Sequence, residues 1–351
     1  MEIVLYVLTV FFIVTPYLPA TEHPHWFYRM PDFVRLQTIG IQLLLIVLFF
    51  FIIQPWHLAD YIMVAALLVT LIYQIVKVFP YSKLYPRQKP DFESGGCVSI
   101  LAGNVFQDNH SYDKFIAEVK RFDPDMVLTM ESDQKWEDGL SELEETYPHT
   151  TKIPLDNYYG MHLYSKIALK NLEVHYHVED DIPSILFECP VTEAQDVFFA
   201  CLHPAPPSPT ENETSKERDA ELMMVGKKIR EMKKPVVVCG DMNDVVWSRT
   251  TRLFKKMTAM IDPRIGRGFF PTYHAGYRLM RFPLDHLFHT KDLFVKTMIR
   301  SNNFDSDHFA MYYEIHLRAG RGPETKGELD TEEKHEVEEK IEEGIEKTKE
   351  S

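Results

Sequence analysis

Three apolar stretches dominate the first 80 residues of the chain. They run from Ile3 to Leu18, from Ile39 to Ile53 and from Tyr61 to Val78. A helix that crosses a bilayer needs ~20 mostly apolar residues, because its backbone polar groups must pair with one another in the hydrocarbon. Residues 1–80 are therefore predicted to form an all-α transmembrane region of about three helices.

The charges around these stretches predict how the membrane region is oriented. Three spans place the loop Thr21–Gln37 and everything after Pro80 on the same side of the bilayer. The Lys and Arg residues near the spans all fall on that side, namely Arg29, Arg35, Lys77, Lys83, Arg87 and Lys89. The positive-inside rule then predicts an integral protein of the plasma (inner) membrane with a cytoplasmic catalytic domain. A cleaved signal peptide is the alternative for the first stretch, but the acidic Glu2 is atypical of one.

After residue 80 the hydrophobic rhythm changes. Residues 81–95 are expected to be a linker, and residues 96–318 a catalytic domain built from short β-rich runs and amphipathic helices. The runs expected as strands are Val98–Leu101, Met126–Met130, Gly160–Tyr164, Val197–Leu202, Val236–Cys239, His286–His289 and Phe309–Ile315. The segments expected as helices are Tyr112–Phe122, Glu137–Tyr147, Ser215–Met232 and Thr250–Met260. Because helices interrupt the strands irregularly, the pattern predicts an α/β domain of layered sheets rather than a barrel of βα repeats.

The last segment, residues 319–351, has a different composition from the rest. It holds twelve carboxylates against six Lys and Arg, and so contributes −6 to the net charge of −14. Its helix-like spacing shows no apolar face, which predicts an acidic tail that is disordered or a solvated helix.

Composition also argues against two kinds of protein. Proteins that follow long nucleic acids usually carry a basic stripe, and this acidic chain shows none. None of the four cysteines has the CxxC spacing of a zinc site, so a structural zinc ion is not expected.

Polar residues that suit phosphate chemistry stand at or near the ends of the predicted strands. Residues that leave a sheet at the same edge can converge on one cleft although they are far apart in sequence. The residues in such positions are Asn104, Glu131, His203, Asp241, Asn243, Asp285, Asp307 and His308.

The most informative segment is Cys239–Asp244, which follows the buried run Pro235–Val238. Gly240 permits a sharp turn off the strand, and Asp241 and Asn243 can then both reach one phosphate or metal ion. The alternative is an ordinary Asx-turn that caps the next helix.

Each of the other candidate residues also has both a functional and a structural interpretation. Glu131 follows a strand directly and suits a hard cation, although this segment taken alone favours a solvated Glu in the first turn of a helix. His308 is the natural base and Asp285 its orienter, although Ser-Asp-His also occurs as a plain turn. His203 precedes a proline-rich loop and is either structural or placed to contact a phosphate oxygen.

Taken in order, these residues form the series Asn…Glu…His…Asp-x-Asn…Asp-His…Ser-Asp-His. This series resembles the endonuclease/exonuclease/phosphatase superfamily over about Cys97 to Leu317. The resemblance implies a four-layer α/β/β/α sandwich with its cleft at one edge of the paired sheets. The apolar spans and the loop Trp26-Phe27-Tyr28-Arg29 are also similar to a membrane-anchored bacterial branch of this superfamily.

The resemblance also implies a role for each candidate residue. The implied ligands of Mg²⁺ or Mn²⁺ are Glu131, Asn104 and Asp307. Asp241 and His308 would activate the attacking water, and Asp285 would pair with His308. Asn243 would hold a phosphate oxygen and His203 would face the leaving group.

The expected function is therefore that of a membrane-anchored, metal-dependent phosphodiesterase of nuclease-like type. A phospholipid or inositol phosphate phosphatase or phosphodiesterase is the alternative substrate class. A catalytically inactive membrane-bound interaction module is the second alternative, although a decayed site would be expected to have lost at least one of these residues. Two further residues are expected to be structural: Tyr164 in packing, and Arg218 in a helix-surface salt bridge.

Overall fold

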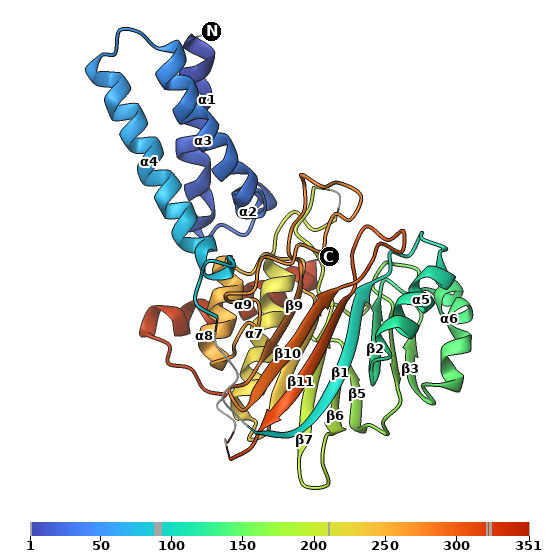
Figure 1. The fold of residues 1–351 in the computed structure, drawn as a ribbon. Helices are drawn as coiled ribbons and strands as arrows, with labels where there is room; N and C mark the ends of the chain where they lie inside the picture. Colours follow the sequence, from blue (N-terminus) through green and yellow to red (C-terminus); the bar gives the residue numbers. More distant parts are fainter. Residues whose placement is uncertain (1, 88–92, 210, 321, 323–324, 351) are drawn as a thin grey trace.

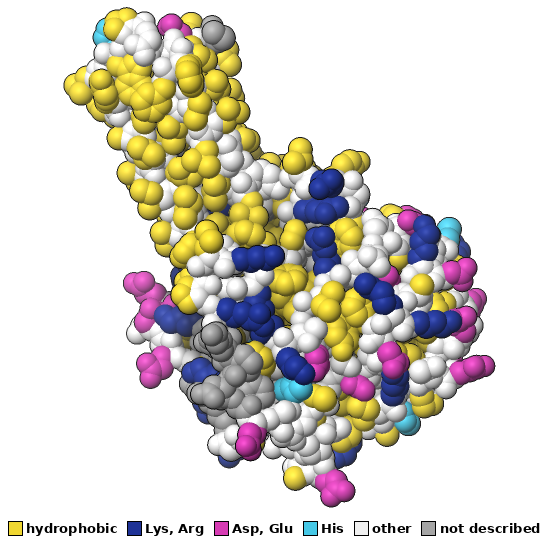
Figure 2. All heavy atoms as spheres, viewed as in Figure 1, with side chains coloured by type: hydrophobic (Ala, Val, Ile, Leu, Met, Phe, Trp, Pro, Cys, Tyr) yellow, Lys and Arg dark blue, Asp and Glu magenta, His cyan; other side chains and the backbone are white. Residues whose placement is uncertain are grey.

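The chain forms a rod of helices that stands on a larger α/β body (Figure 1). This computed structural model describes residues 2–87, 93–209, 211–320, 322 and 325–350. Apolar side chains cover the rod, whereas charged side chains are spread over the body (Figure 2).

The rod consists of the amino-terminal helices. Helix α1 (Glu2–Val14) continues into the 3₁₀ helix η1 (Thr15–Thr21), and α3 (Arg35–Ile52) and α4 (Leu58–Val78) pack beside it. In the described part of the chain, three helical segments are long and apolar enough to cross a membrane: Glu2–Thr21, Arg35–Ile52 and Leu58–Tyr81. They agree in place with the three predicted spans.

The segment expected as the loop Thr21–Gln37 contains a short helix, α2 (Trp26–Phe33), which contacts the α/β body. Trp26 N donates to Glu213 O at 2.9 Å, and Ser215 N donates to Pro24 O at 2.9 Å. The base of the rod is therefore attached to the body by backbone hydrogen bonds.

The body contains two sheets that pack face to face. The first has the order β10-β11-β1-β2-β4-β3 and the second has the order β5-β6-β7-β8-β9. The strands of the first sheet are β1 (Ser94–Asn104), β2 (Met126–Met130), β3 (His149–Ile153), β4 (Met161–Ser165), β10 (Leu293–Arg300) and β11 (Met311–Arg318). Those of the second are β5 (Lys170–His175), β6 (Ser184–Pro190), β7 (Asp196–Leu202), β8 (Val236–Asp241) and β9 (Asp285–His289).

Helices cover the outer face of each sheet. The first sheet carries α5 (Tyr112–Phe122), α6 (Gln134–Gly139) and the 3₁₀ helix η3 (Ser141–Glu145), and the second carries α7 (Lys216–Glu231) and α8 (Arg249–Thr258). The core between the sheets includes Ile100, Leu128, Phe187, Phe199 and Val237, all of them buried. The result is the expected α/β/β/α sandwich.

Secondary structure differs from the sequence prediction mainly at the sheet edges. Each of the seven predicted strands overlaps an observed strand, but β3, β5, β6 and β10 were not predicted. Three of these four are edge strands, whose partly exposed residues weaken the apolar signal. The predicted helix Glu137–Tyr147 is split into α6 and η3.

The tail was expected to be disordered or a solvated helix without an apolar face, and its larger part is a helix that packs on the body. Residues Thr331–Glu350 form helix α9, in which Val337 is buried and Ile341 packs against the same core as α7. Lys256 and Arg249 of α8 form ion pairs with Glu333 and Glu336 of α9. A single apolar turn together with these ion pairs is sufficient to hold the helix against the body.

The structure describes the expected linker of residues 81–95 except for residues 88–92, which lie outside the described residues. Its first residue closes the 3₁₀ helix η2 (Phe79–Tyr81), and Tyr81 is buried with its hydroxyl donating to Val246 O at 3.3 Å. The exit from α4 is thus packed on the body, and β1 begins at Ser94.

Candidate active site

The candidate residues gather at one edge of the two sheets. Asn104 ends β1 and Glu131 directly follows β2, while Asp241 ends β8 and His203 follows β7. Parallel pairing of β1 with β2 and of β7 with β8 brings the carboxyl ends of these strands together. Asp285 is opposite Asp241 in the antiparallel pair of β8 and β9.

A glycine allows this edge to form. Gly240 pairs with Leu202 and has a φ of 138°, and a Cβ atom at Gly240 would lie 1.9 Å from Leu202 O. No other residue fits that approach, so the glycine permits β7 and β8 to deliver His203 and Asp241 side by side.

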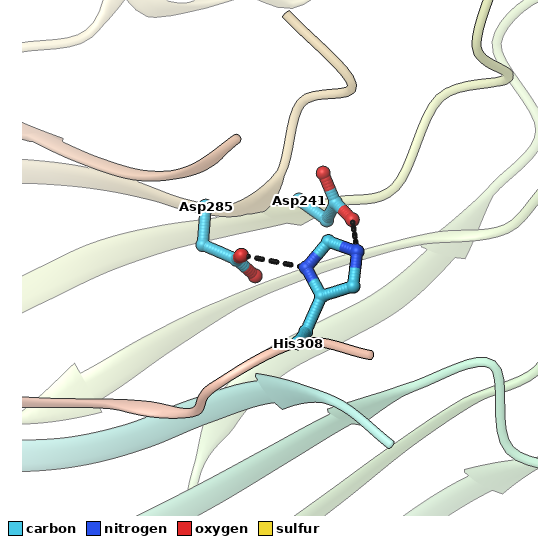
Figure 3. Close-up of side chains that lie close together, drawn as sticks. All are labelled: Asp241, Asp285 and His308. Atoms are coloured by element: carbon cyan, nitrogen blue, oxygen red, sulfur yellow. Dashed lines mark hydrogen bonds and ion pairs between the residues drawn. The ribbon is translucent and has the colours of Figure 1, made fainter. Parts of the chain in front are cut away.

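His308 lies between two carboxylates (Figure 3). Its Nδ1 is 2.9 Å from Asp285 Oδ2, and its Nε2 is 3.4 Å from Asp241 Oδ2. Burial lowers the pKa of His308, but the two carboxylates outweigh burial and raise this pKa to about 10. The ring is therefore protonated at neutral pH, donates from Nδ1 to Asp285 and forms an ion pair with Asp241.

Glu131 and Asn104 form the second part of the site. Asn104 Nδ2 donates to Glu131 Oε1 at 2.6 Å and is 3.3 Å from Asp241 Oδ2. Burial raises the pKa of Glu131 to about 8, and repulsion from Asp307 and Asp241 acts in the same direction. Asn104 thus connects the Glu131 carboxyl to the His308 cluster.

A cleft of about 420 Å³ opens beside these groups. Its polar lining includes Glu131, His203, Asn243 and Asp307. Aromatic side chains complete one wall, namely Phe106, Tyr158 and Tyr159.

Four residues of the cleft have left-handed backbone conformations. The φ angles are 59° at Phe106, 58° at Glu131, 67° at Tyr158 and 49° at Asn243. Such angles are uncommon for residues with a side chain and gather at functional sites, where surrounding contacts hold the strain. The cleft is therefore a specialised part of the fold rather than a gap between loops.

His203 is a neutral imidazole at the cleft wall. Burial lowers its pKa to about 4, and its ring packs 5.4 Å from that of Tyr159. Its Nδ1 has no hydrogen-bond partner among the described residues. A buried polar atom without a partner is uncommon, and a bound substrate could supply the missing one.

Asn243 is held from three sides. Its backbone N donates to Asp241 Oδ1 at 3.0 Å, and its Nδ2 donates to Pro204 O at 3.0 Å. Arg218 Nη1 donates to Asn243 O at 2.8 Å. One of the two Nδ2 hydrogens is thereby used, which leaves one for a phosphate oxygen.

Arg218 corrects a sequence prediction. It was expected in a salt bridge on a helix surface. Instead it is 1% exposed and lies beneath the loop after β8 that contains Asn243. Its guanidinium pairs with Asp219 at 2.8 Å and is 3.6 Å from Asp244. Tyr164, expected in packing, is fully buried in the core under α5 and α6.

The structure brings all eight candidates to this edge, though in different positions. Glu131, His203, Asn243 and Asp307 line the cleft, whereas Asn104, Asp241, Asp285 and His308 are buried beside it. Sequence reasoning missed Phe106, Tyr158, Tyr159 and Glu211, which line the cleft from loops that carry no motif. The Tyr159 hydroxyl donates to Glu211, so this pair closes one side of the cleft.

A hard divalent cation fits the donor set of this site. Three aspartates, one glutamate whose pKa is raised by burial, and one histidine lie together, so acidic side chains outnumber basic ones in this part of the described structure. Asp241, Asp285 and His308 offer ligand atoms within 4.8 Å of one another, but both ring nitrogens already face carboxylates. Glu131 is the better ligand, because it lines the cleft and, among the described residues, its oxygens accept only from amide groups of Asn104 and Gln107.

The sequence matches the model of the Endonuclease/Exonuclease/phosphatase family over residues 103–308. The chain belongs to this family. Members of this family are phosphoester hydrolases and typically use a divalent metal ion. No curated protein matches the sequence.

Solved structures of the same fold are similar to this chain. Humanized TDP2 of D. rerio has 15% identity and a TM-score of 0.52, over 62% of this chain and 98% of that one. The catalytic domain of human Nocturnin with bound sulfate has 16% identity and a TM-score of 0.51, over 65% and 97%. An endonuclease/exonuclease/phosphatase from Beutenbergia cavernae has 15% identity and a TM-score of 0.51, over 64% and 72%. At these identities the likeness shows the fold.

Proposed function

We propose that the protein is a membrane-anchored, divalent-metal-dependent phosphodiesterase. The observation that carries this proposal is the buried His308, held between Asp241 and Asp285 next to the pair formed by Asn104 and Glu131. Helices α1 with η1, α3 and α4 would anchor it in the plasma membrane, with the body in the cytoplasm.

The cation, Mg²⁺ or Mn²⁺, would be held by Glu131 with Asp307 and Asn104. When bound, it would neutralise charge on the phosphoryl oxygens. Asn243, through its remaining amide hydrogen, and the neutral His203 would hold the substrate at the cleft wall.

Asp241 is the group that this geometry favours for orienting water. Its Oδ1 accepts from Asn243 N, and within the described part of the chain its Oδ2 has two long contacts, 3.3 Å to Asn104 and 3.4 Å to His308. That oxygen can therefore accept a proton from water, and the protonated His308 can stabilise the charge that develops. Asp285 holds the ring of His308 in place.

Hydrolysis by the full chain in detergent tests this function. A water-soluble aryl phosphodiester should be cleaved with Mg²⁺ or Mn²⁺ and not with EDTA. Asp241→Ala and His308→Ala should each lower turnover at least ~10²-fold, which is the usual contribution of a general acid or base. Tyr164→Phe is the matched control, because the buried Tyr164 hydroxyl has no hydrogen-bond partner among the described residues. Near-normal turnover by both site variants would refute the proposed site.

A further inference from the structure

One loop joins the active site to the base of the membrane rod. Residues 272–282, here called the entrance loop, lie between α8 and β9. Ala275 N donates to Asp307 O at 2.6 Å, and Phe309 N donates to Thr272 O at 3.1 Å. The ring centroids of Tyr273 and His308 are 4.9 Å apart. The entrance loop thus packs directly against the segment that carries Asp307 and His308.

The same loop contacts the start of a membrane helix. Gln37 Nε2 donates to Leu279 O at 2.9 Å, and the rings of Phe33 and Phe282 pack edge to face at 6.1 Å. Gln37 is the third residue of α3, so at 1.5 Å per residue it lies only ~3 Å along the axis from the first. The tip of the loop therefore lies beside the first turn of α3, at the end of this candidate span that is nearest the body.

The tip exposes apolar side chains that nothing in the described structure covers. Tyr277 is 64% exposed, Leu279 is 85% exposed and Met280 is 45% exposed. The loop also carries Arg278 and Arg281 and no carboxylate. Lys and Arg side chains gather on the part of the body next to the rod (Figure 2). An apolar tip flanked by cations is typical of segments that enter the headgroup region of an anionic bilayer.

We propose that the entrance loop is a membrane-docking loop, which inserts its apolar tip into the bilayer interface and presents the cleft to a phosphate ester carried by a membrane lipid. This inference rests on the proposed phosphodiesterase function and names its substrate class. The loop attaches to Asp307 at its base and to Gln37 at its tip, so docking sets the distance between the membrane and the site.

A lipid accounts for these features better than a nucleic acid does. Exposed Leu and Met side chains offer little to a polyanion, whose binding depends on phosphate contacts with Lys and Arg. Insertion of the same side chains into the interface removes them from water. The three spans also hold the site close to lipid headgroups at all times.

The first test compares two substrates in one preparation, the full chain reconstituted in phosphatidylcholine/phosphatidylglycerol vesicles. The variant Tyr277→Ser/Leu279→Ser/Met280→Ser should lower hydrolysis of vesicle phospholipid at least ~10-fold, since burial of one Leu side chain already corresponds to such a factor. Hydrolysis of the soluble aryl phosphodiester should be unchanged. The matched control is Tyr176→Ser, an exposed aromatic next to β5, at the opposite edge of the sheet from β9.

Equal loss or equal retention of both activities by the triple variant would overturn the inference. The inference would also be overturned if the reconstituted wild-type protein cleaved a single-stranded oligonucleotide and no phospholipid. That second outcome would leave the phosphodiesterase itself intact, whereas inactivity toward every substrate would remove the proposed function.

The second test measures docking without any substrate. In a Cys97→Ser background, which removes the exposed native cysteine, a fluorophore is attached at Leu279→Cys or at Tyr176→Cys. Lipids with a headgroup-level nitroxide should quench the label at position 279 and not the label at position 176. Equal quenching at the two positions would overturn the docking of the loop.

Discussion

Asp219 is the residue whose neutralisation should destabilise the fold most clearly. It is 2% exposed in its side chain and accepts from Arg218 at 2.8 Å and from Lys340 at 2.9 Å, while Arg29 is 3.4 Å away. These partners come from α7, from α9 and from α2. One buried carboxylate therefore joins the base of the membrane rod, the body and the carboxy-terminal helix.

The magnitude follows from the charges that would be left behind. Burial alone would raise the pKa of Asp219, but Lys340, Arg218 and Arg29 outweigh it and hold this pKa well below its usual range. Asp219 is thus ionised at neutral pH, and its stabilising effect is lost only when the pH falls into the strongly acidic range. Asp219→Asn keeps the shape but leaves three buried cations without their shared partner, which should cost about 3–5 kcal/mol of unfolding free energy.

Thermal unfolding in detergent, followed by near-ultraviolet circular dichroism, measures this loss. At ~2–4 °C per kcal/mol for a domain of this size, the midpoint should fall by about 6–20 °C. Glu338→Gln is the matched control, because it breaks only the exposed pair between Lys227 and Glu338, of the kind that contributes ~0–1 kcal/mol. A melting midpoint for Asp219→Asn as high as that of the control would refute the argument.

Two further predictions follow from single residues of the site. Since the pKa of Glu131 is about 8, a cation must displace its proton at lower pH, so Mn²⁺ affinity measured by titration should rise about tenfold per pH unit from pH 6 to 8 and then level off. Glu131→Gln should weaken binding and remove this slope, and a flat wild-type profile would contradict the assignment of Glu131 as a ligand. Gly240→Ala should lower stability by ~3 kcal/mol or more, because its Cβ would clash with Leu202 O, whereas Gly322→Ala, which meets no atom within 4 Å, should melt as the wild type does.

The fold was largely predictable from the sequence because its central strands are apolar runs of the right length. Val236–Cys239 and Met126–Met130 are buried along their whole length and stand out against their surroundings. Edge strands such as β5 carry Lys170, Asn171 and Glu173 in an exposed or half-exposed position, so their composition resembles that of a loop. Pairing with a neighbour, and not local preference, makes them strands.

The candidate residues of the site could be predicted from the sequence, but the side chains that surround them could not. The order of motifs identified Asp241, Asn243 and His308, because each follows or precedes a strand in a recognisable segment. Nothing local indicated that Arg218 would be buried under Asn243, since its contacts depend on how α7 packs on the loop after β8. The entrance loop was missed for a similar reason: its meaning depends on its contact with Gln37, which lies 242 positions earlier in the chain.

The distribution of charge explains how an acidic protein can accept a phosphate ester. The chain has a net charge of −14, and the carboxylates at the site add to the repulsion that an incoming phosphate meets. Arg281 and Arg300 oppose this repulsion from near His308, where both stack on the ring of Phe309, with distances of 5.0 and 4.2 Å to its centroid. Neither arginine forms an ion pair with a described carboxylate, and both donate to backbone carbonyls instead, so their charge is not neutralised by a described acidic side chain. If the proposed function holds, the two arginines would attract an anionic phosphate ester toward this side of the site, and a cation held by Glu131 would balance the charge of the bound phosphate.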